Sequence, residues 1–185
     1  MTLNRVAEID GVRIKPIQSA SDIRGSFTKF HPLNEIENPL DSVAISFNPT
    51  IGTVRGLHFQ VDPFAEEKLV TCIQGSIFDV IVDLRPGSKT FGKWTSFDLN
   101  AANLLQVYLP KGIAHGFQTL APKTIVHYCL TAEYAPDSSY IINPFGDLDI
   151  SWPMDTKNVS YRDKSGLTFS SAAKKYAAAI GLPLE

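Results

Sequence analysis

The feature that most constrains the fold of this chain is a long series of short runs with β-strand character. These runs alternate polar and apolar residues or are rich in β-branched side chains, and Gly, Pro, Asn or Asp separate them. Gly75 separates two of them in the manner of a hairpin turn. We therefore expect strands at Val12–Ile17, Gly25–Phe30, Ser42–Asn48, Thr53–Gln60, Lys68–Gln74, Ser76–Leu84, Thr95–Leu99, Leu105–Leu109, Gly116–Leu120 and Thr124–Thr131.

The remaining segments complete an all-β prediction. The run SSAAKKYAAAIG near the C-terminus is rich in Ala and ends in Gly, which predicts a short helix. The segment Pro32–Leu40 has the character of a loop or a short helix. No repeat or linker divides the 185 residues, so we expect one domain, residues 1–185. Its predicted architecture is a jelly roll, in which two antiparallel sheets close on a cavity suited to a small molecule.

Composition argues against several classes of protein. The net charge is −2 and Lys and Arg form no cluster, which is unlike a dedicated nucleic-acid-binding protein. The sequence begins with no secretion-signal pattern, and its apolar runs are too short to cross a bilayer. We therefore expect a cytoplasmic protein with no membrane partner. Cys72 and Cys129 lie in strand-like runs and are expected to be buried and reduced.

One expected strand, VRGLHFQ, carries a histidine. Its alternation places Leu57 and Phe59 on one face and Gly56, His58 and Gln60 on the other. An imidazole between a glycine, which leaves space, and an amide, which can hydrogen-bond, suits a binding site. A core histidine with one hydrogen-bond partner fits the same pattern, so this strand alone leaves both interpretations open.

Neighbouring runs add further candidates. His115 lies in PKGIAHGFQTL beside a glycine, at the start of a strand. Lys68 opens an apolar strand, either as an inward cation or as an edge lysine that reaches solvent. Asp79 and Asp83 share one face of SIFDVIVDL, and carboxylates among apolar residues need partners. One of the two is suited to holding a histidine, and Asp83 equally suits a cap on the turn that follows.

Two tyrosines and an acid complete the candidates. Tyr128 lies inside an expected strand and Tyr134 just beyond it, a spacing that also suits ordinary packing. Asp163 lies in the polar stretch YRDKS, where a solvated carboxylate is the ordinary interpretation. None of these three residues identifies a site by itself.

Taken together, these stretches resemble the dTDP-4-dehydrorhamnose 3,5-epimerase family of cupin-fold sugar-nucleotide epimerases. The resemblance runs in order from about Val12 to Asp163, with Lys68 ten residues after His58. It implies a cupin-type jelly roll, an isomerase without a cofactor, a nucleotide-diphosphate sugar substrate and a homodimer that serves deoxysugar and surface-polysaccharide (O-antigen or lipopolysaccharide) synthesis. The motifs that carry it are DIRGSF, GTVRGLHFQ, GSIFDVIVDLRPGSKTFGKW, YLPKGIAHGFQTL and ISWP.

The resemblance also implies catalytic roles. His58 matches the general base, Asp163 the acid that pairs with it, and Tyr128 the proton donor on the opposite face of the sugar. Lys68 and His115 match residues that line the keto and hydroxyl groups of the sugar. The implied catalytic set is His58, Lys68, Tyr128 and Asp163.

The substrate contacts implied by the same resemblance surround the sugar and the nucleotide. Arg24 and Arg55 match substrate contacts, with Arg24 near the diphosphate, and Arg162 matches a further basic contact. Tyr134 matches an aromatic residue that shapes the sugar pocket, and Phe27 one that is contributed to the base across the dimer interface. The full set is Arg24, Phe27, Asn48, Arg55, Gln60, His115, Tyr134 and Arg162.

The chemistry of a 4-keto sugar explains why these residue types occur. The ketone acidifies the hydrogens on C3 and C5, because loss of either proton gives an enolate. Inversion then needs a base on one face and an acid on the other. Histidine accepts a proton near neutral pH, a paired carboxylate stabilises the resulting imidazolium, and lysine stabilises the enolate oxygen. Tyrosine, which is protonated at neutral pH, returns a proton from the opposite side.

Three positions depart from the family pattern. Lys29 and Ser139 stand where the family often has an acid, and Ile142 where it often has an arginine. We expect these changes to affect contacts to the nucleotide and the outer sugar. They leave open a dTDP-, UDP-, CDP- or GDP-sugar, and inversion at one carbon or at both.

Two other functions fit parts of the sequence. A catalytically silent module would bind a sugar nucleotide without turning it over, as the altered loop from Ser138 to Asp147 allows. A metal-dependent cupin would use His58, His115 and either Glu66 or Glu67 as ligands. Gln60 stands where cupin metal sites have their second histidine, so we expect no metal.

Overall fold

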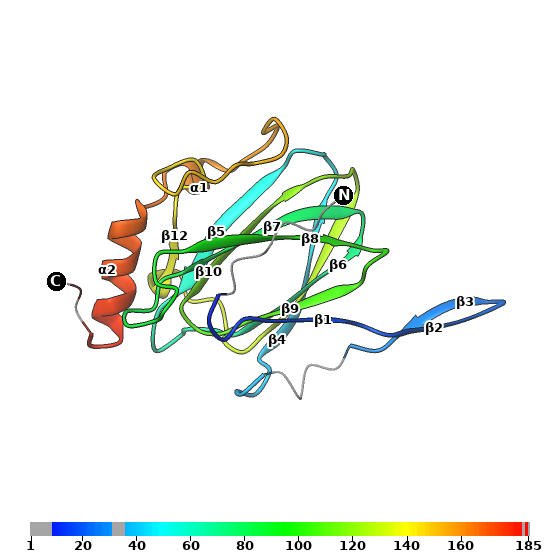
Figure 1. Cartoon of the computed structure of the whole chain (residues 1–185), viewed down its shortest axis with the longest axis horizontal. Coiled ribbons are helices and arrows are strands. Elements are labelled where there is room, and N and C mark those ends of the chain that lie inside the picture. The colour runs from blue at the N-terminus through cyan, green and yellow to red at the C-terminus, as the bar shows by residue number, and fades with distance from the viewer. Residues whose placement is uncertain (1–8, 31–35, 183, 185) are drawn as a thin grey trace.

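The computed structural model describes residues 9–30, 36–182 and 184, and in these ranges two five-stranded antiparallel sheets pack face to face (Figure 1). This confirms the predicted all-β fold. The first sheet has the order β1 (Arg13–Pro16), β9 (Leu105–Leu109), β6 (Lys68–Gln74), β11 (Thr124–Leu130) and β4 (Ser42–Asn48). The second sheet has the order β12 (Ser139–Ile141), β5 (Val54–Gln60), β10 (Ile113–Thr119), β7 (Ser76–Asp83) and β8 (Trp94–Asn100).

A two-stranded hairpin projects from this sandwich. It consists of β2 (Ser19–Asp22) and β3 (Gly25–Thr28), and it extends away from both sheets at one end of the molecule (Figure 1). Nearly all of its residues are exposed. The sequence pattern predicted β3 but indicated only a turn-rich connection at SASDIRG. The presence of β2 there corrects that prediction. For the segment expected as loop or short helix, residues 31–35 lie outside the described residues, and residues 36–40 form neither helix nor strand.

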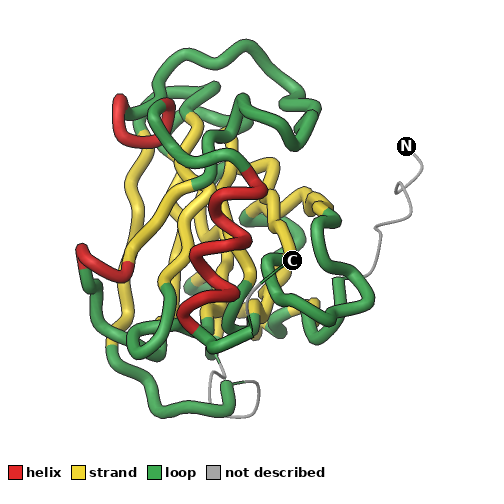
Figure 2. The backbone as a smooth tube through the Cα atoms, turned by 90° about the vertical axis from the view of Figure 1, so that its left-hand side faces the viewer, coloured by secondary structure: helices red, strands yellow, loops and turns green. Residues whose placement is uncertain are grey.

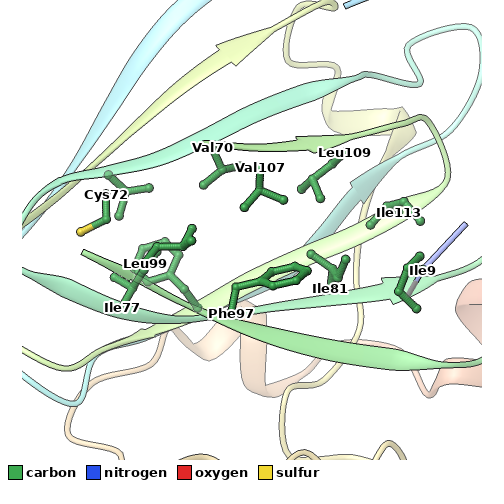
Figure 3. Close-up of a cluster of buried hydrophobic side chains, with 12 residues drawn as sticks. Ile9, Val70, Cys72, Ile77, Ile81, Phe97, Leu99, Val107, Leu109 and Ile113 are labelled. Atoms are coloured by element: carbon green, nitrogen blue, oxygen red, sulfur yellow. The ribbon is translucent and has the colours of Figure 1, made fainter. Parts of the chain in front are cut away.

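The main hydrophobic core fills the space between the two sheets. Figure 3 shows Val70 and Val107 of the first sheet facing Ile77, Ile81 and Leu99 of the second, all of them fully buried. Fully burying one such side chain contributes about 1.5–3 kcal/mol to folding. The strand bounds agree with the alternation in the sequence to within a few residues, and the largest difference is at β10, which begins three residues earlier than expected.

Both cysteines are free and buried, as predicted. Cys72 belongs to the main core, and Cys129 lies in a small apolar cluster with Leu69 and Tyr108. Burial raises the pKa of the Cys72 thiol to about 11, so this thiol is protonated at neutral pH. Neither cysteine therefore contributes a reactive thiolate.

The outer face of the second sheet is covered by the C-terminal helix. This helix, α2 (Phe169–Ala179), confirms the prediction from the Ala-rich run, and Figure 2 shows it lying across the strands. Its buried residues Ala172, Ala173 and Tyr176 share a cluster with Leu57 of β5. The N-cap Thr168 accepts a hydrogen bond from the Ser171 amide, which satisfies a free donor of the first turn. In the described ranges, no helix has the length and apolar character needed to span a membrane.

Candidate active site

A cavity of about 540 Å³ opens between the two sheets. It is walled by β5 and β10 from the second sheet and by β4, β6 and β11 from the first. The predicted residues that line it are Arg55, His58, Gln60, Lys68, His115, Tyr128, Tyr134 and Arg162. Most of the predicted site therefore converges on one cavity.

His58 and Asp163 form a hydrogen-bonded pair at the cavity. His58 Nε2 lies 2.8 Å from Asp163 Oδ1, and the backbone N–H of Gly56 donates to Oδ2 at 3.4 Å. Asp163 belongs to a single-turn helix, α1 (Tyr161–Lys164), whose N-cap Ser160 accepts from the Asp163 amide. The carboxylate is buried, so the interpretation of Asp163 as a solvated acid is wrong.

The environment keeps Asp163 ionised. Burial alone would raise its pKa, but the hydrogen bond and charge of His58, with further hydrogen bonds from Ser160 and Gly56, lower the pKa below the usual aspartate value. The imidazole is partly open to the cavity, with 42% of its side chain exposed. Because Nε2 is bound to the carboxylate, Nδ1 is the nitrogen left to meet a ligand.

His115 and Asp79 form a second pair of the same kind. His115 Nε2 lies 2.6 Å from Asp79 Oδ1, and both side chains are buried. The register of β5 and β10 places His115 directly opposite His58. Asp79 is thus the aspartate that holds a histidine. Asp83 instead accepts hydrogen bonds from residues of the following turn, among them Arg85, as its capping interpretation predicted.

Glycines allow the two histidine strands to approach closely. Gly56 has a φ of +102°, and a Cβ there would lie 2.6 Å from the carbonyl oxygen of His115. A Cβ on Gly116 would lie 2.6 Å from the carbonyl oxygen of Arg55. Any larger residue at either position would push β5 and β10 apart. These glycines therefore fix the separation of the two imidazoles.

Lys68 points into the cavity and does not reach solvent as an edge lysine. Its ammonium lies 3.0 Å from the carboxylate of Glu66, with 9% of the lysine side chain and 11% of the glutamate side chain exposed. A buried ammonium is costly unless it is paired, so Glu66 is what allows this cation to lie inside the cavity. The result is a hydrogen-bond donor with positive charge in the same cavity as His58.

The two tyrosines lie in different parts of the site. Tyr128, on β11, is half-buried, and its ring meets that of His115 edge-on at a centroid distance of 6.2 Å. Burial raises the pKa of Tyr128 far above the usual tyrosine value, and the charge of Asp79 adds to this effect. Tyr134 is 61% exposed, and its hydroxyl accepts a 2.7 Å hydrogen bond from Arg162. The pair of Tyr134 and Arg162 lies at the rim of the cavity.

A second groove, of about 570 Å³, adjoins the cavity. It shares Arg55, His58 and Arg162 with the cavity and adds Lys157 and Lys164. His58 is thus accessible from a region rich in positive charge, which suits an anionic group such as a diphosphate.

The side-chain amides of Gln60, which lines the cavity, and of Asn48, which does not, are engaged in hydrogen bonds within the protein. The amide nitrogen of Gln60 donates to the carbonyl oxygens of Phe64 and Glu133, and its oxygen accepts from the Ala135 amide. Asn48 is buried outside the cavity lining, and its amide donates to backbone carbonyls on β4 and β11. These hydrogen bonds indicate a structural role for both side chains, and their predicted contact with the substrate stays a prediction.

The three positions that depart from the family pattern lie in different environments in the structure. Ser139 lines the cavity, whereas Lys29 is exposed just after β3. Ile142 is fully buried in the cluster beneath α2. The expectation that Ile142 alters an outer-sugar contact is therefore wrong, because its side chain packs in the core.

Arg24 and Phe27 lie on the projecting hairpin and do not line the cavity of their own chain. Both are exposed, and Arg24 is hydrogen-bonded to Asp22 on the same hairpin. This arrangement leaves the hairpin free to reach another molecule.

The ligand set proposed for a metal-dependent cupin is not assembled. Among the described residues, no group of three or more His, Cys, Asp and Glu side chains is placed to hold a metal ion. Glu66 is paired with Lys68, and Glu67 instead binds backbone and side-chain groups of residues 37, 38 and 108. The four side chains expected as metal ligands all have other partners in the protein, namely those of His58, His115, Glu66 and Glu67.

Sequence reasoning missed part of the cavity wall. Ser42, Ala44 and Ser46 of β4 line the cavity, and so does Glu66, which the sequence suggested only as a metal ligand. The alternation of β4 carries the missing signal, because its small residues share one face while Val43 and Phe47 on the other face are exposed. Ile45 is also exposed and contributes to the cavity lining. A strand with small residues on its inner face leaves room for a ligand.

Comparison with known proteins gives consistent matches. Residues 6–171 match the model of the dTDP-4-dehydrorhamnose 3,5-epimerase family. The chain is 39% identical over 168 residues to the dTDP-4-dehydrorhamnose 3,5-epimerase of Sinorhizobium fredii, covering 86% of this chain and 84% of that protein. It is 36% identical over 171 residues to the dTDP-4-dehydrorhamnose 3-epimerase of Streptomyces niveus, covering 89% and 82%. A crystal structure of the Legionella pneumophila epimerase with dTDP-4-keto-L-rhamnose is similar, with a TM-score of 0.82, 32% identity and coverage of 89% of this chain and 90% of that one.

Proposed function

The chain belongs to the dTDP-4-dehydrorhamnose 3,5-epimerase family, and from this membership we propose that it is an isomerase of a nucleotide-linked 4-keto-6-deoxy sugar. It inverts C3, C5 or both carbons through an enolate. The observation that carries the proposal is that His58, backed by Asp163, shares one cavity with Tyr128. His58 comes from the second sheet and Tyr128 from the first, so a sugar bound between them meets the two groups on opposite faces.

His58 acts as the general base in this proposal. Its free Nδ1 removes the proton next to the ketone, and Asp163, held ionised, stabilises the imidazolium that forms. Tyr128 then donates its phenolic proton to the opposite face of the enolate. The raised pKa of Tyr128 keeps this proton in place at neutral pH until the carbanion can accept it. Each such acid or base contributes about 10² to 10⁴-fold to the rate.

The enolate and the diphosphate require positive charge. Lys68 supplies a buried ammonium for the oxygen on C4, and His115 is placed to hydrogen-bond to the same part of the sugar. Arg55 and Arg162 lie where the cavity meets the basic groove, which supports a role in binding the diphosphate. Tyr134 accepts a hydrogen bond from Arg162, and both residues line the cavity.

Deuterium exchange tests this function. The protein is incubated in D2O with dTDP-4-keto-6-deoxyglucose, and in parallel with the UDP, CDP and GDP sugars. We expect deuterium at C3, C5 or both with the dTDP sugar, and the number of positions labelled distinguishes a 3-epimerase from a 3,5-epimerase. His58→Ala should abolish exchange. Tyr128→Phe should retain partial exchange but lose most inversion, because His58 can still return a proton to the face it came from. Absence of label with every sugar, together with binding by calorimetry, would favour the non-catalytic module.

We also propose a homodimer in the cytoplasm, in which the β2–β3 hairpin of one subunit completes the site of the other. Support comes from the exposure of Arg24 and Phe27 and from the fact that neither lines the cavity of its own chain. Phe27→Ala and His58→Ala subunits are mixed in equal amounts after mild dissociation. About half of the dimers that re-form are mixed, and each mixed dimer has one intact site of two. The mixture should therefore regain about a quarter of the wild-type specific activity. A monomer mass in light scattering, or no recovery on mixing, would contradict the shared site.

A further inference from the structure

Three titratable side chains follow one another across the cavity. His58 and His115 are directly opposite on adjacent antiparallel strands, where side chains lie about 5 Å apart at Cβ and point to the same face. His115 in turn meets the ring of Tyr128 edge-on at 6.2 Å. His115 therefore lies next to both the proposed base and the proposed acid.

The proton balance of the proposed reaction requires a proton to move from His58 to Tyr128, and His115 lies between them. One inversion transfers a proton from carbon to His58 and another from Tyr128 to carbon. It leaves an imidazolium at His58 and a phenolate at Tyr128, with the sugar neutral again. The enzyme cannot repeat the reaction in the same direction until a proton has moved from His58 to Tyr128. Burial and the charge of Asp79 raise the pKa of Tyr128, so the phenolate readily takes a proton from a neighbouring imidazolium.

We propose that the His115–Asp79 pair is the proton relay that resets the enzyme after each inversion, an inference that rests on the function proposed above. Asp79 accepts the hydrogen on Nε2 of His115, which leaves Nδ1 free to take a proton. Nδ1 receives the proton from the His58 imidazolium, and His115 is briefly an imidazolium itself. It then releases this proton to the phenolate of Tyr128. Both histidines end neutral and Tyr128 ends protonated, so the resting state is restored.

The buried carboxylate of Asp79 suits this role. It is fully buried on β7 and lies 2.6 Å from His115, and no described residue hydrogen-bonds to its second oxygen, Oδ2. A buried, incompletely satisfied carboxylate favours a positive charge beside it, which is the charge that His115 carries during the transfer. Asp79 is thus a positioning residue that acts through His115.

Single-turnover and steady-state kinetics test the relay, with dTDP-4-keto-6-deoxyglucose as the probe. His115→Gln retains an amide that can hydrogen-bond to Asp79 and to the sugar but cannot carry a proton. We expect a burst of about one equivalent of inverted product per site, followed by a steady state at least about tenfold slower than the burst. Added imidazole should raise the steady-state rate and leave the burst unchanged. The wild type should show no burst.

Two further variants keep the test decisive. Asp79→Asn should show the same burst, followed by a smaller decrease in the steady-state rate. This variant also tests the relay if His115→Gln does not fold. His127→Gln is the matched control, because His127 is adjacent to Tyr128 on β11, faces away from the cavity and should show wild-type kinetics. Equal slowing of the first and later turnovers in both His115→Gln and Asp79→Asn would overturn the relay. A wild-type protein that fails to exchange deuterium would instead refute the proposed function.

Discussion

Replacing Gln60 by Met distinguishes a structural role for this side chain from a role in binding the substrate. The Gln60 amide donates to the Phe64 and Glu133 carbonyls at 2.9 and 3.0 Å, and it accepts from the Ala135 amide at 2.9 Å. It thereby joins the segment after β5 to the loop that carries Tyr134. Methionine has a similar volume and none of these hydrogen bonds.

The magnitude follows from the three backbone groups that the substitution leaves unpaired. A buried group without a partner costs about 1–3 kcal/mol, and these groups are only partly buried, so we expect a loss of about 2–4 kcal/mol. For a protein of this size each kcal/mol lowers Tm by about 2–4 °C, which gives a decrease of about 5–15 °C. Thermal unfolding followed by circular dichroism measures it. Because the loop carrying Tyr134 loosens, KM should rise more than kcat falls.

Gln74→Met is the control for this substitution. The Gln74 amide donates to the Lys123 carbonyl at 2.7 Å on the surface, so its loss should change stability by no more than about 0.5 kcal/mol. A Gln60→Met protein with the wild-type Tm and a raised KM would refute the structural assignment. It would show that Gln60 binds the substrate, as its place in the sequence motif first implied.

Three other expectations concern the catalytic pair, its acid stability and the rim of the cavity. Asp163→Asn should reduce turnover to a value between those of His58→Ala and Tyr128→Phe, measured as inversion by NMR. The pKa values of Asp83 and Asp163 lie below that of an unfolded aspartate, about 3.9, so the folded state binds these protons more weakly. Their contribution to stability is therefore complete above about pH 4 and is lost as the pH falls through the lowered values. Urea unfolding between pH 2 and 6 should follow this trend, and Asp83→Asn should flatten it. Tyr134→Phe removes the oxygen that accepts from Arg162, an exposed contact worth less than about 1 kcal/mol, so KM should change by no more than about fivefold with kcat unchanged.

The two-residue period of strands explains why much of the site could be predicted. β5 is an interior strand, so its alternation places His58 toward the cavity and Leu57 in the core beneath α2. The same period places Tyr128 inward and His127 outward on β11. Where a side chain's direction depends only on its strand, the sequence is sufficient.

Hydrogen-bond partners from distant segments could not be predicted in this way. Gln60 is satisfied by residues more than seventy positions later, and Asn48 by the carbonyl of Thr124. β12 has three residues and α1 has four, which is too short for a periodic signal. Each is held in place by tertiary contacts, β12 by its pairing with β5 and α1 by the pairing of Asp163 with His58.

Because of the projecting hairpin, we expect that the protein can lose activity while its subunits stay folded. Within the part of the chain that the structure describes, the two strands of the hairpin pair only with each other, whereas β5 and β10 lie inside a sheet backed by two hydrophobic clusters. Amide hydrogens of the hairpin should exchange with solvent quickly in an isolated subunit, and those of β5 only on global unfolding. If the hairpin completes a neighbouring site, dilution should inactivate the enzyme while each subunit stays folded. Specific activity would then depend on protein concentration, so an assay at nanomolar enzyme could report a lower turnover number than the same preparation shows at micromolar concentration.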